Sequence, residues 1–475
     1  MTHQLVLPFN TTHNLLLIIL FSLQIISLQS FYFDPNNNNQ QPATTSLSST
    51  VHNNITTIMT PDNQHIDSNI TPVATPPSVT SISEDDSSLS DSMTSSMCSS
   101  TESSSAAASK YEELIIQPHT QHKKVLVTGG AGFIGSSVAE ALLARGDDVI
   151  IVDEMNDYYD VAIKENNLQR LRQLYPSNKQ QLTIHRGDIC NEQFMHNIFE
   201  SERPEWVCHL AARAGVRPSI QDPFVYIHSN IRGTTHLMEL SHKFGIKNFV
   251  FASSSSVYGG SKSTYFSEDE SVDNPVSPYA ASKKACELLA YTYHHLYKLN
   301  VSGLRFFTVY GPNGRPDMAP YKFVHRISRG EELQKFGDGS SSRDYTYISD
   351  IVDGVIRSID RPYSYQLFNL GKGNGTSLNE FISIVEKHVG KKAVIKQMPD
   401  QPGDVPYTCA SVEKARVLLG YEASVSFDEG IQRTVGWYRN SRQEAEAVAM
   451  ESKTPLRKTP SYADMARQHM LIIPR

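Results

Sequence analysis

The stretch TGGAGFIGSSVAEALLARG, residues 128–146, follows an apolar run and opens a helical pattern. Its glycines Gly129, Gly132 and Gly135 occur at every third position. In such a strand–turn–helix unit, the first glycine makes the tight turn, the second lets the backbone approach a pyrophosphate, and the third lets the helix lie close on the sheet. The helix N-terminus then presents N–H groups to the phosphates. The stretch therefore predicts a dinucleotide site, with glycines of an ordinary turn as the alternative.

Three further strand ends extend this site. A second apolar strand ends in Asp153, whose carboxylate suits the hydroxyls of an adenosine ribose and would repel the additional phosphate of NADP, so NAD is the predicted cofactor. Gly187-Asp188-Ile189 suits the adenine edge, and the small residues of HLAARAG (209–215) permit close approach, although simple strand-end packing would explain both. The cofactor-binding residues expected besides the glycines are Phe133, Ile134, Asp153, Asp188, Ile189, Ala211 and Ala212.

Apolar runs alternate with helical patterns from about Lys123 to Arg439. Continuous apolar strands between amphipathic helices indicate a parallel sheet that is covered on both faces. The predicted fold class is therefore α/β, with a Rossmann-type doubly wound parallel sheet. The runs are VLVT (125–128), VIIV (149–152), WVCHL (206–210), NFVFAS (248–253) and VSGLRFF (301–307).

The N-terminal part has a different composition. The first 109 residues contain no Lys or Arg and eight acidic residues, whereas the remainder keeps all 43 basic residues and 42 of the 50 acidic ones. The remainder is thus nearly neutral within a chain of net charge −7, and no basic stripe suggests nucleic acid. Residues 34–109 are rich in Asn, Ser, Thr and Pro, so we expect a disordered stem there. Glycosylation triplets at Asn54 and Asn69 agree with a lumenal location.

Residues Leu15–Phe33 form an uncharged run of 19 residues. As a helix this run would be about 30 Å long, which is about the thickness of one bilayer core. We therefore predict a signal anchor or a signal peptide within residues 1–33, with an apolar patch in an unstructured leader as the alternative. At the other end, the polar tail 440–475 is expected to be a frayed helix or disordered.

The five cysteines are scattered and contain no CxxC pair. Their odd number and their spacing argue against a disulfide framework and against a zinc site. We expect free thiols that are mostly buried, and no metal. The cysteines are Cys98, Cys190, Cys208, Cys286 and Cys409.

A second group of reactive side chains follows the strand NFVFAS, which ends in SSSSVYGG. A helix then begins in SPYAASKK, where Tyr279 and Lys283 are four residues apart and therefore share one helical face. A phenol has a pKa of about 10, and a nearby ammonium favours its ionised form. Tyr279 could then take a proton from a sugar hydroxyl while hydride leaves the same carbon, with Ser254 bonded to the reacting oxygen. A surface pair is the alternative, which the neighbouring nucleotide motif disfavours.

Together, TGGAGFIG, the serine-rich strand end, YAASK and RDYTYISDIVDG resemble the extended short-chain dehydrogenase/reductase family, which includes the nucleotide-sugar epimerases and dehydratases. The resemblance covers roughly residues 123–437. It implies a Rossmann domain with a smaller C-terminal substrate domain, within a catalytic region 123–439. The NAD part would lie mainly in 123–311 and 345–370, and the substrate part mainly in 312–344 and 371–437.

The same resemblance assigns roles to single residues. Ser254, Tyr279 and Lys283 would form the catalytic triad, and Tyr279 and Lys283 would also contact the cofactor. Arg343 and Asp404 would contact the nucleotide diphosphate and the uridine. Dehydratases carry an Asp-Glu pair after the catalytic hydroxyl, and here these positions are Ser255 and Ser256, so elimination of water is not expected. Both serines are expected to contact substrate instead.

The stretches HLAARAGVRPS and TVYGPNGRPDMAPYKF closely resemble the UDP-glucuronate 4-epimerases. By this resemblance Thr308 and Arg315 would hold the carboxylate of the sugar, a task that suits the planar fork of arginine. A salt bridge of Arg315 within its own loop is the alternative. Three departures concern the substrate fit: Arg213 replaces a usual Gln, Pro218 a usual Tyr, and Ser411 a usual Asp.

The implied reaction is the NAD-dependent interconversion of UDP-glucuronate and UDP-galacturonate. The sugar is oxidised at carbon 4 and receives the hydride back on its opposite face. A UDP-glucuronate decarboxylase or a UDP-glucose/galactose 4-epimerase is the alternative, and a non-catalytic NAD-binding sensor is a more distant one. The resemblance further implies a homodimer packed through the helix from Tyr279 and the helix around 231–244. It also implies a type II Golgi membrane location with a lumenal catalytic domain, or otherwise a cytoplasmic one.

Overall fold

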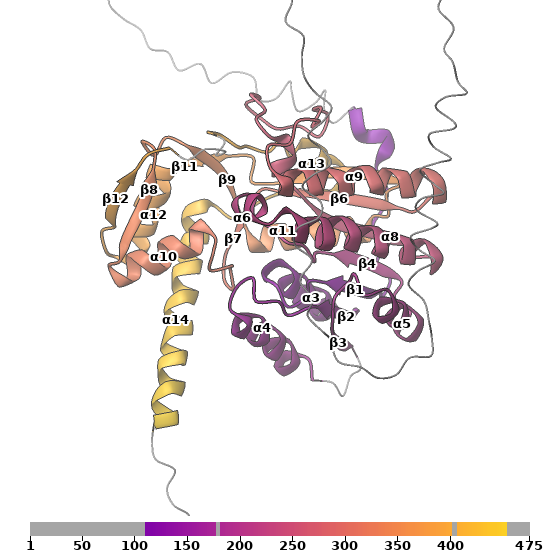
Figure 1. The fold of residues 1–475 in the computed structure, drawn as a ribbon, viewed down its shortest axis with the longest axis horizontal. Coiled ribbons are helices and arrows are strands. Elements are labelled where there is room, and N and C mark those ends of the chain that lie inside the picture. Colours follow the sequence, from indigo (N-terminus) through magenta and orange to yellow (C-terminus); the bar gives the residue numbers. More distant parts are fainter. Residues whose placement is uncertain (1–109, 177–180, 401–405, 454–475) are drawn as a thin grey trace, which may run out of the picture. The chain divides into compact units, whose positions relative to one another are not determined.

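The computed structural model describes residues 110–176, 181–400 and 406–453. Within these residues, a parallel sheet of seven strands forms the centre of the molecule (Figure 1). The predicted α/β class with a doubly wound parallel sheet is confirmed. In spatial order the strands are β10 (Tyr365–Leu370), β6 (Val301–Phe306), β5 (Asn248–Ser254), β4 (Trp206–His209), β1 (Lys124–Thr128), β2 (Asp148–Asp153) and β3 (Leu182–Arg186).

The order of these strands places the ligand site. From β1 the chain first adds β2 and β3 on one side, and then it crosses to add β4, β5, β6 and β10 on the other. In an open α/β sheet, ligands bind outside the carboxyl ends of the strands where the winding reverses in this way. The reversal lies between β1 and β4, which pair in parallel from Val125 and Trp206 to Thr128 and His209.

Both faces of the sheet are covered by helices, which explains the continuous apolar runs. Successive residues of β1 enter different cores: Val125 and Val127 pack in the larger cluster, with Leu142 of α3, whereas Leu126 packs with Leu237 of α8 in a second cluster. The helices that cover or connect these strands are α3 (Phe133–Arg145), α4 (Val161–Leu174), α5 (Glu192–Glu202), α6 (Val216–Gln221), α7 (Pro223–Tyr226), α8 (Gly233–Lys243), α9 (Pro278–Tyr297) and α11 (Ile348–Asp360), with the π-turn η3 (Ile227–Arg232) and the 3₁₀ turns η1 (Glu112–Leu114) and η4 (Ser255–Tyr258).

A smaller group of elements extends beyond one side of the central sheet in Figure 1. It contains a three-stranded sheet of β11 (Gly375–Ser377), β9 (Ser342–Tyr347) and β7 (Thr308–Tyr310), and a parallel pair of β12 (Val394–Met398) and β8 (Glu332–Phe336), counted within the described residues. The remaining helices are α10 (Ala319–Arg329), α12 (Leu378–Val389), α13 (Glu413–Leu419) and α14 (Phe427–Lys453). Helix α14 runs on past Arg439, where the sequence suggested that order ends, to Lys453.

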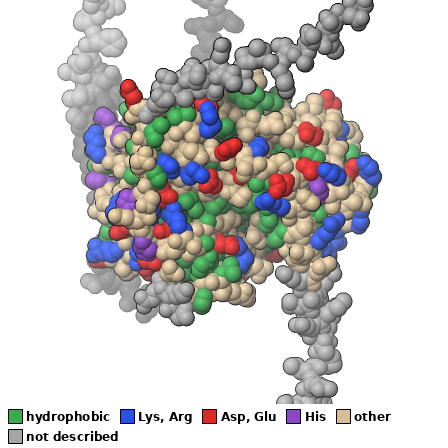
Figure 2. All heavy atoms as spheres, turned by 180° about the vertical axis from the view of Figure 1, so that it is seen from behind, with side chains coloured by type: hydrophobic (Ala, Val, Ile, Leu, Met, Phe, Trp, Pro, Cys, Tyr) green, Lys and Arg blue, Asp and Glu red, His purple; other side chains and the backbone are tan. Residues whose placement is uncertain are grey.

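Several predictions from the sequence concern residues that the structure does not describe. They include those on Leu15–Phe33, on the stem 34–109, on Cys98 and on the tail after Lys453. Within the described residues, no helix combines the length and the apolar character that crossing a bilayer requires. The four described cysteines are free and buried, as predicted. The face shown in Figure 2 carries basic and acidic side chains next to one another.

Between β1 and α8 the core contains His209, whose ring nitrogens bond Thr128 Oγ1 at 2.7 Å and Thr234 Oγ1 at 2.9 Å. Burial lowers the pKa of His209 from 6.5 to about 3, so the folded chain keeps it neutral while the unfolded chain protonates it below about pH 6.5. Stability should therefore fall as the pH decreases, and His209 should contribute about 2 kcal/mol of that loss between pH 7 and pH 5.

His209→Gln, which can still bond both threonines, should therefore flatten the pH dependence of unfolding by this amount. Chemical denaturation at several pH values measures it. Leu237→Ala on α8 provides the control, because it removes no titratable group and should lower the stability by the same amount at every pH. Equal slopes for the wild type and His209→Gln would contradict the prediction.

Candidate active site

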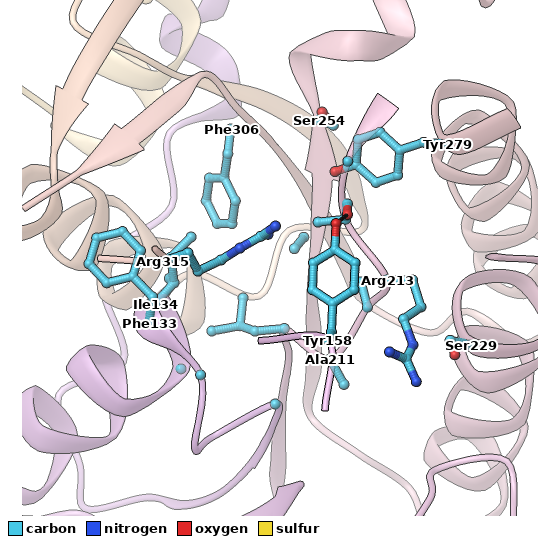
Figure 3. A pocket seen from close by; sticks show the side chains of 18 of the residues that line it. Phe133, Ile134, Tyr158, Ala211, Arg213, Ser229, Ser254, Tyr279, Phe306 and Arg315 are labelled. Atoms are coloured by element: carbon cyan, nitrogen blue, oxygen red, sulfur yellow. Dashed lines mark hydrogen bonds between the residues drawn. The ribbon is translucent and has the colours of Figure 1, made fainter. Parts of the chain in front are cut away.

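A cavity of about 420 Å³ lies at the predicted edge of the central sheet. This volume is within the usual range for small-molecule sites. Figure 3 shows side chains from several separate elements that point into it. The cavity collects every predicted cofactor residue: Gly129, Gly132, Phe133, Ile134, Gly135, Asp153, Asp188, Ile189, Ala211, Ala212, Tyr279 and Lys283.

The glycine-rich turn leaves no room for side chains. Gly129 has a φ of +69°, and a Cβ atom there would lie 2.7 Å from the Ala211 backbone nitrogen. Gly132 precedes α3, and no side chain caps that helix end. Gly132, Phe133 and Ile134 line the cavity, so the first turn of α3 lies at the cavity without a side-chain cap. The turn thus has the shape and the polarity of a pyrophosphate cradle.

Gly135 lets α3 lie against this turn, because a Cβ atom there would be only 2.1 Å from the Gly129 carbonyl oxygen. Gly135→Ala should therefore push α3 outward, lower the free energy of unfolding by about 2–3 kcal/mol and weaken NAD binding. Thermal denaturation and cofactor titration measure the two effects. The matched control is Gly436→Ala in α14, where a Cβ would meet nothing within 4 Å. That variant should be slightly more stable than the wild type, and a Gly135→Ala protein of wild-type stability would refute the close packing.

Asp153, at the end of β2, is buried and holds the loop that follows it. Its carboxylate accepts hydrogen bonds from the backbone nitrogens of Ala131 at 3.1 Å and Met155 at 2.9 Å. Lys164 of α4 lies 3.8 Å away and also lines the cavity, a contact that the sequence analysis did not anticipate. Burial lowers the pKa of Lys164, and Asp153 opposes that change. The carboxylate is therefore fixed in position where an adenosine ribose would lie.

Asp188 belongs to the segment that the sequence analysis expected at the adenine edge. Its Oδ2 is 2.9 Å from His228 Nε2, and its Oδ1 accepts the backbone N–H of Cys190 at 2.8 Å. Potential ligand atoms of these three side chains lie within 4.8 Å of one another, a grouping that the sequence did not indicate. Burial raises the pKa of the Cys190 thiol to about 12, so the thiol keeps its proton near neutral pH. Internal hydrogen bonds thus hold this wall of the cavity together.

The predicted catalytic side chains meet in the same cavity (Figure 3). Ser254 ends β5, and Tyr279 lies in the first turn of α9. Burial raises the pKa of Tyr279, while a hydrogen bond with Ser254 and the charge of Arg315 lower it. We expected Lys283 to provide that lowering. Instead, Lys283 Nζ donates to the Ala252 carbonyl oxygen at 2.8 Å, and burial lowers the pKa of this amine.

A buried polar network behind these residues aligns α9 with the strand ends. Glu287, two turns after Tyr279, accepts two hydrogen bonds of 2.9 Å from Arg305 of β6. It also accepts one of 2.6 Å from Ser253, the neighbour of Ser254. Since the carboxylate and the guanidinium are almost completely buried, each depends on the other to offset its desolvation. The network therefore fixes the register between the helix that carries Tyr279 and the strand that carries Ser254.

Most of the predicted substrate residues are also brought together. Ser255, Ser256, Thr308 and Arg315 line the cavity. Arg343 is not among its lining residues in the described part of the chain; it lies on β9 and donates to the Ser342 carbonyl oxygen at 2.9 Å. Asp404 lies outside the described residues.

Arg315 forms the salt bridge that the sequence analysis gave as the alternative, and it also lines the cavity. It forms the salt bridge within its own loop, since Nε and Nη2 donate to the Asp317 carboxylate at 3.0 and 2.6 Å. Its side chain nevertheless extends into the cavity, as Figure 3 shows, and it lies over the ring of Tyr158 with 5.2 Å from Cζ to the ring centroid. Burial disfavours the charge, but Asp317 outweighs this effect and raises the pKa of Arg315.

The loop after β2 supplies several of the cavity residues that the sequence analysis missed. Tyr158 and Tyr159 line the cavity, and Tyr158 Oη donates to the Ala214 carbonyl oxygen at 2.6 Å. Glu154 of the same loop lies 3.3 Å from Arg213, one of the departures noted above. The available signal was the position of EMNDYYD (154–160), which follows the end of a parallel strand and contains two adjacent aromatic residues.

Fold and site together define the class of this protein, an extended short-chain dehydrogenase/reductase with a nucleotide cleft. Residues 126–434 match the family model of the GDP-mannose 4,6 dehydratases. The chain belongs to the NAD-dependent epimerase/dehydratase family.

Relatives within the family are similar over the whole catalytic region. A UDP-glucuronate 4-epimerase of Thermodesulfobacterium geofontis is 47% identical over 317 residues, which are 66% of this chain and 96% of that relative. UDP-glucuronate 4-epimerase 4 of Arabidopsis thaliana is 40% identical over 66% of this chain and 75% of its own. The crystal structure of a Bacillus cereus UDP-glucuronic acid 4-epimerase with UDP-glucuronic acid and NAD matches with a TM-score of 0.62 and 34% identity, over 67% of this chain and 99% of that one.

Proposed function

We propose that the chain is a UDP-glucuronate 4-epimerase, which interconverts UDP-glucuronate and UDP-galacturonate with NAD as cofactor. The observation that carries this proposal is the position of Arg315, which lies in one cavity with Ser254 and Tyr279. A guanidinium that lines the cavity suits a sugar acid, because its planar fork can receive a carboxylate. The similarity to the Thermodesulfobacterium enzyme and to the Bacillus complex points to the same substrate.

The residues present fit NAD. The uncapped end of α3 and the side-chain-free turn at Gly129 suit a pyrophosphate, and the fixed carboxylate of Asp153 suits an unphosphorylated ribose. When bound there, NAD accepts a hydride from carbon 4 of the sugar and later returns it. Since the cofactor is regenerated in each cycle, none needs to be exchanged.

The chain's own groups manage the proton. Tyr279 Oη accepts the proton of the 4-hydroxyl group, and Ser254 hydrogen-bonds the same sugar oxygen. Lys283 Nζ donates to the Ala252 carbonyl oxygen, and in its protonated form it favours the phenolate of Tyr279 one turn away. Ser255 and Ser256 contact the sugar without providing an acid that could expel a hydroxyl group. In the reverse half of the cycle Tyr279 Oη returns the proton.

Arg315 and Thr308 hold the carboxylate of the sugar. Oxidation at carbon 4 creates a β-keto acid, which loses carbon dioxide when the breaking bond stands perpendicular to the carbonyl plane. A carboxylate that is held in another orientation, with its charge stabilised, resists this loss. Arg343 and Asp404 remain our proposal for contacts with the diphosphate and the uridine. Both residues belong to the substrate part that we propose from the sequence, which lies mainly in residues 312–344 and 371–437.

The test is an assay of the purified full-length chain with UDP-glucuronate, followed by chromatography of the product. We expect UDP-galacturonate as the product, with no net change in NAD. Release of carbon dioxide as the main outcome would indicate a decarboxylase instead. Turnover of UDP-glucose would indicate an epimerase of neutral sugars, and NAD binding without any turnover would indicate a sensor.

We also propose a homodimer that packs through α8 and α9, which lie side by side (Figure 1). Large apolar side chains on α9 are more than half exposed in the single chain, as is Phe224 in the neighbouring α7. Such exposure is typical of a surface that a partner covers. Sedimentation of the full-length chain should give twice the mass of one chain. The apolar residues of α9 that are more than half exposed are Leu288, Tyr291 and Leu296.

For the location we propose a Golgi membrane anchor in Leu15–Phe33, with the catalytic part in the lumen. The support is the uncharged run itself and the glycosylation triplets that follow it. Imaging of the full chain, and of a chain without residues 1–33, tests this proposal. Golgi staining that is lost with the segment would support it. Cytoplasmic staining of the full chain would support the alternative.

A further inference from the structure

Asp317 takes only one of the two edges through which a guanidinium can receive a carboxylate. Its two oxygens face Nε and Nη2 of Arg315 at 3.0 and 2.6 Å. Within the described part of the chain, the Arg315 side chain makes its hydrogen bonds to Asp317. The bond to Asp317 fixes the direction in which the guanidinium points. The other edge, formed by Nη1 and the second N–H of Nη2, makes no bond to Asp317.

The plane of the guanidinium is fixed as well. The ring of Tyr158 lies beneath it, with 5.2 Å from Cζ to the ring centroid. Tyr158 is itself held by the bond from its hydroxyl to the Ala214 carbonyl oxygen at 2.6 Å. The bidentate carboxylate of Asp317 and the ring of Tyr158 together restrict the rotation of the guanidinium. In Figure 3 the Arg315 side chain extends across the cavity toward Tyr158 and the side where Tyr279 lies.

We propose that Asp317 is a positioning residue, which aims the second edge of Arg315 at the carboxylate of the sugar substrate. This inference rests on the proposed function. Asp317 does not compete with the substrate for Arg315, because the two carboxylates use different edges of the fork. The carboxylate of the sugar is then held in one orientation during the time when carbon 4 is a ketone.

The consequence of a loosened clamp is a specific side reaction. When the carboxylate of the 4-keto sugar can rotate, the bond between carbons 5 and 6 breaks and carbon dioxide leaves. The electron pair of that bond passes to the ketone oxygen as an enolate, and a proton then adds at carbon 5. The product is a UDP-4-keto-pentose, and the two electrons taken from carbon 4 remain on the cofactor. Each such event therefore yields one carbon dioxide and one reduced cofactor.

The experiment compares Asp317→Asn with the wild type in the full-length chain, with UDP-glucuronate as the substrate. Asparagine has the same shape, but its amide N–H₂ opposes an N–H of Arg315, so the guanidinium should turn. We expect kcat for epimerisation to fall about 10- to 100-fold, and the share of turnovers that release carbon dioxide to rise about 10-fold. Stopped assays measure both products, and absorbance follows the reduced cofactor.

One control and one second variant separate a positioning role from a general loss of structure. Asp353→Asn removes a carboxylate from another Asp–Arg pair, Asp353–Arg357 at 2.6 Å, outside the cavity, and should change neither quantity. Tyr158→Leu removes the ring beneath Arg315 and should also increase carbon dioxide release. This second variant keeps the proposal testable if Asp317→Asn fails to fold.

The outcomes are distinct. A lower KM with unchanged kcat and no additional carbon dioxide would mean that Asp317 competes with the substrate, and it would overturn the proposal. Wild-type values for Asp317→Asn, or for Tyr158→Leu if Asp317→Asn does not fold, would overturn it too, while leaving the proposed function intact. A wild-type chain that does not act on UDP-glucuronate would overturn both.

Discussion

Replacing Tyr279 with phenylalanine should reduce turnover of UDP-glucuronate by about a thousandfold or more while NAD remains bound. We propose the phenol as the group that exchanges a proton with the 4-hydroxyl, and proton transfer by a positioned side chain typically contributes about 10²–10⁴-fold. The aromatic ring, and with it the packing against Tyr226 at 6.0 Å between centroids, is retained. Initial rates and the cofactor content of the purified protein measure the two parts of the prediction.

Tyr265→Phe is the matched control, because it makes the same change at an exposed position outside the cavity and outside the proposed dimer surface. It should keep the wild-type rate. If Tyr279→Phe turned over at the wild-type rate as well, the proton would have to be taken by another group. The burial of Tyr279 also predicts the direction of pH dependence: its raised pKa should make the rate increase with pH on the alkaline side.

The second large effect is expected for Arg315→Leu. This change would remove the two charge-assisted hydrogen bonds that we propose between Arg315 and the sugar carboxylate, and such bonds contribute about 1.5–3 kcal/mol each. The value of kcat/KM for UDP-glucuronate should therefore fall by about 100- to 1,000-fold or more. Arg315→Lys keeps the charge without the planar fork and should lie between the wild type and Arg315→Leu.

Arg416→Leu is the comparison for a lost surface arginine, since Arg416 pairs with Glu413 at the molecular surface. It should leave kcat/KM unchanged. If Arg315→Leu also kept its activity with UDP-glucuronate, the acid-sugar assignment would be wrong. The chain would then be an epimerase whose specificity lies elsewhere.

The sequence was sufficient for the strands next to the cofactor, because their physical signals are local. An apolar run followed by Gly129 and a helical pattern needs few residues, and the five runs correspond to β1, β2, β4, β5 and β6. Strand β10 was not identified, since Gln366 and Asn369 interrupt YQLFNL (365–370) and leave no continuous apolar run. Its place is set by parallel pairing with β6, a contact between distant parts of the chain.

The site was predictable where neighbouring positions determine it, as for Tyr279 and Lys283. It was not predictable where a loop folds back over the cavity. Tyr158 and Arg315 are in direct contact although more than 150 residues separate them in the sequence, and nothing local to either residue indicates that contact. The pKa of Tyr279 was missed for a similar reason. The penalty of burial depends on the whole surrounding fold, and here it exceeds the help from Ser254 and Arg315.

The late position of β10 in the chain has a consequence for synthesis. Strand β6 ends at Phe306, but its outer neighbour does not leave the ribosome until residue 370 has been made. Until then β6 is an unpaired edge of an apolar sheet, which is prone to aggregate. The intervening segment, which carries Arg315 and Asp317, must therefore emerge before β10 can pair with β6 and complete the sheet. A nascent chain halted before Tyr365 should depend on chaperones, and one halted well after Leu370 should not.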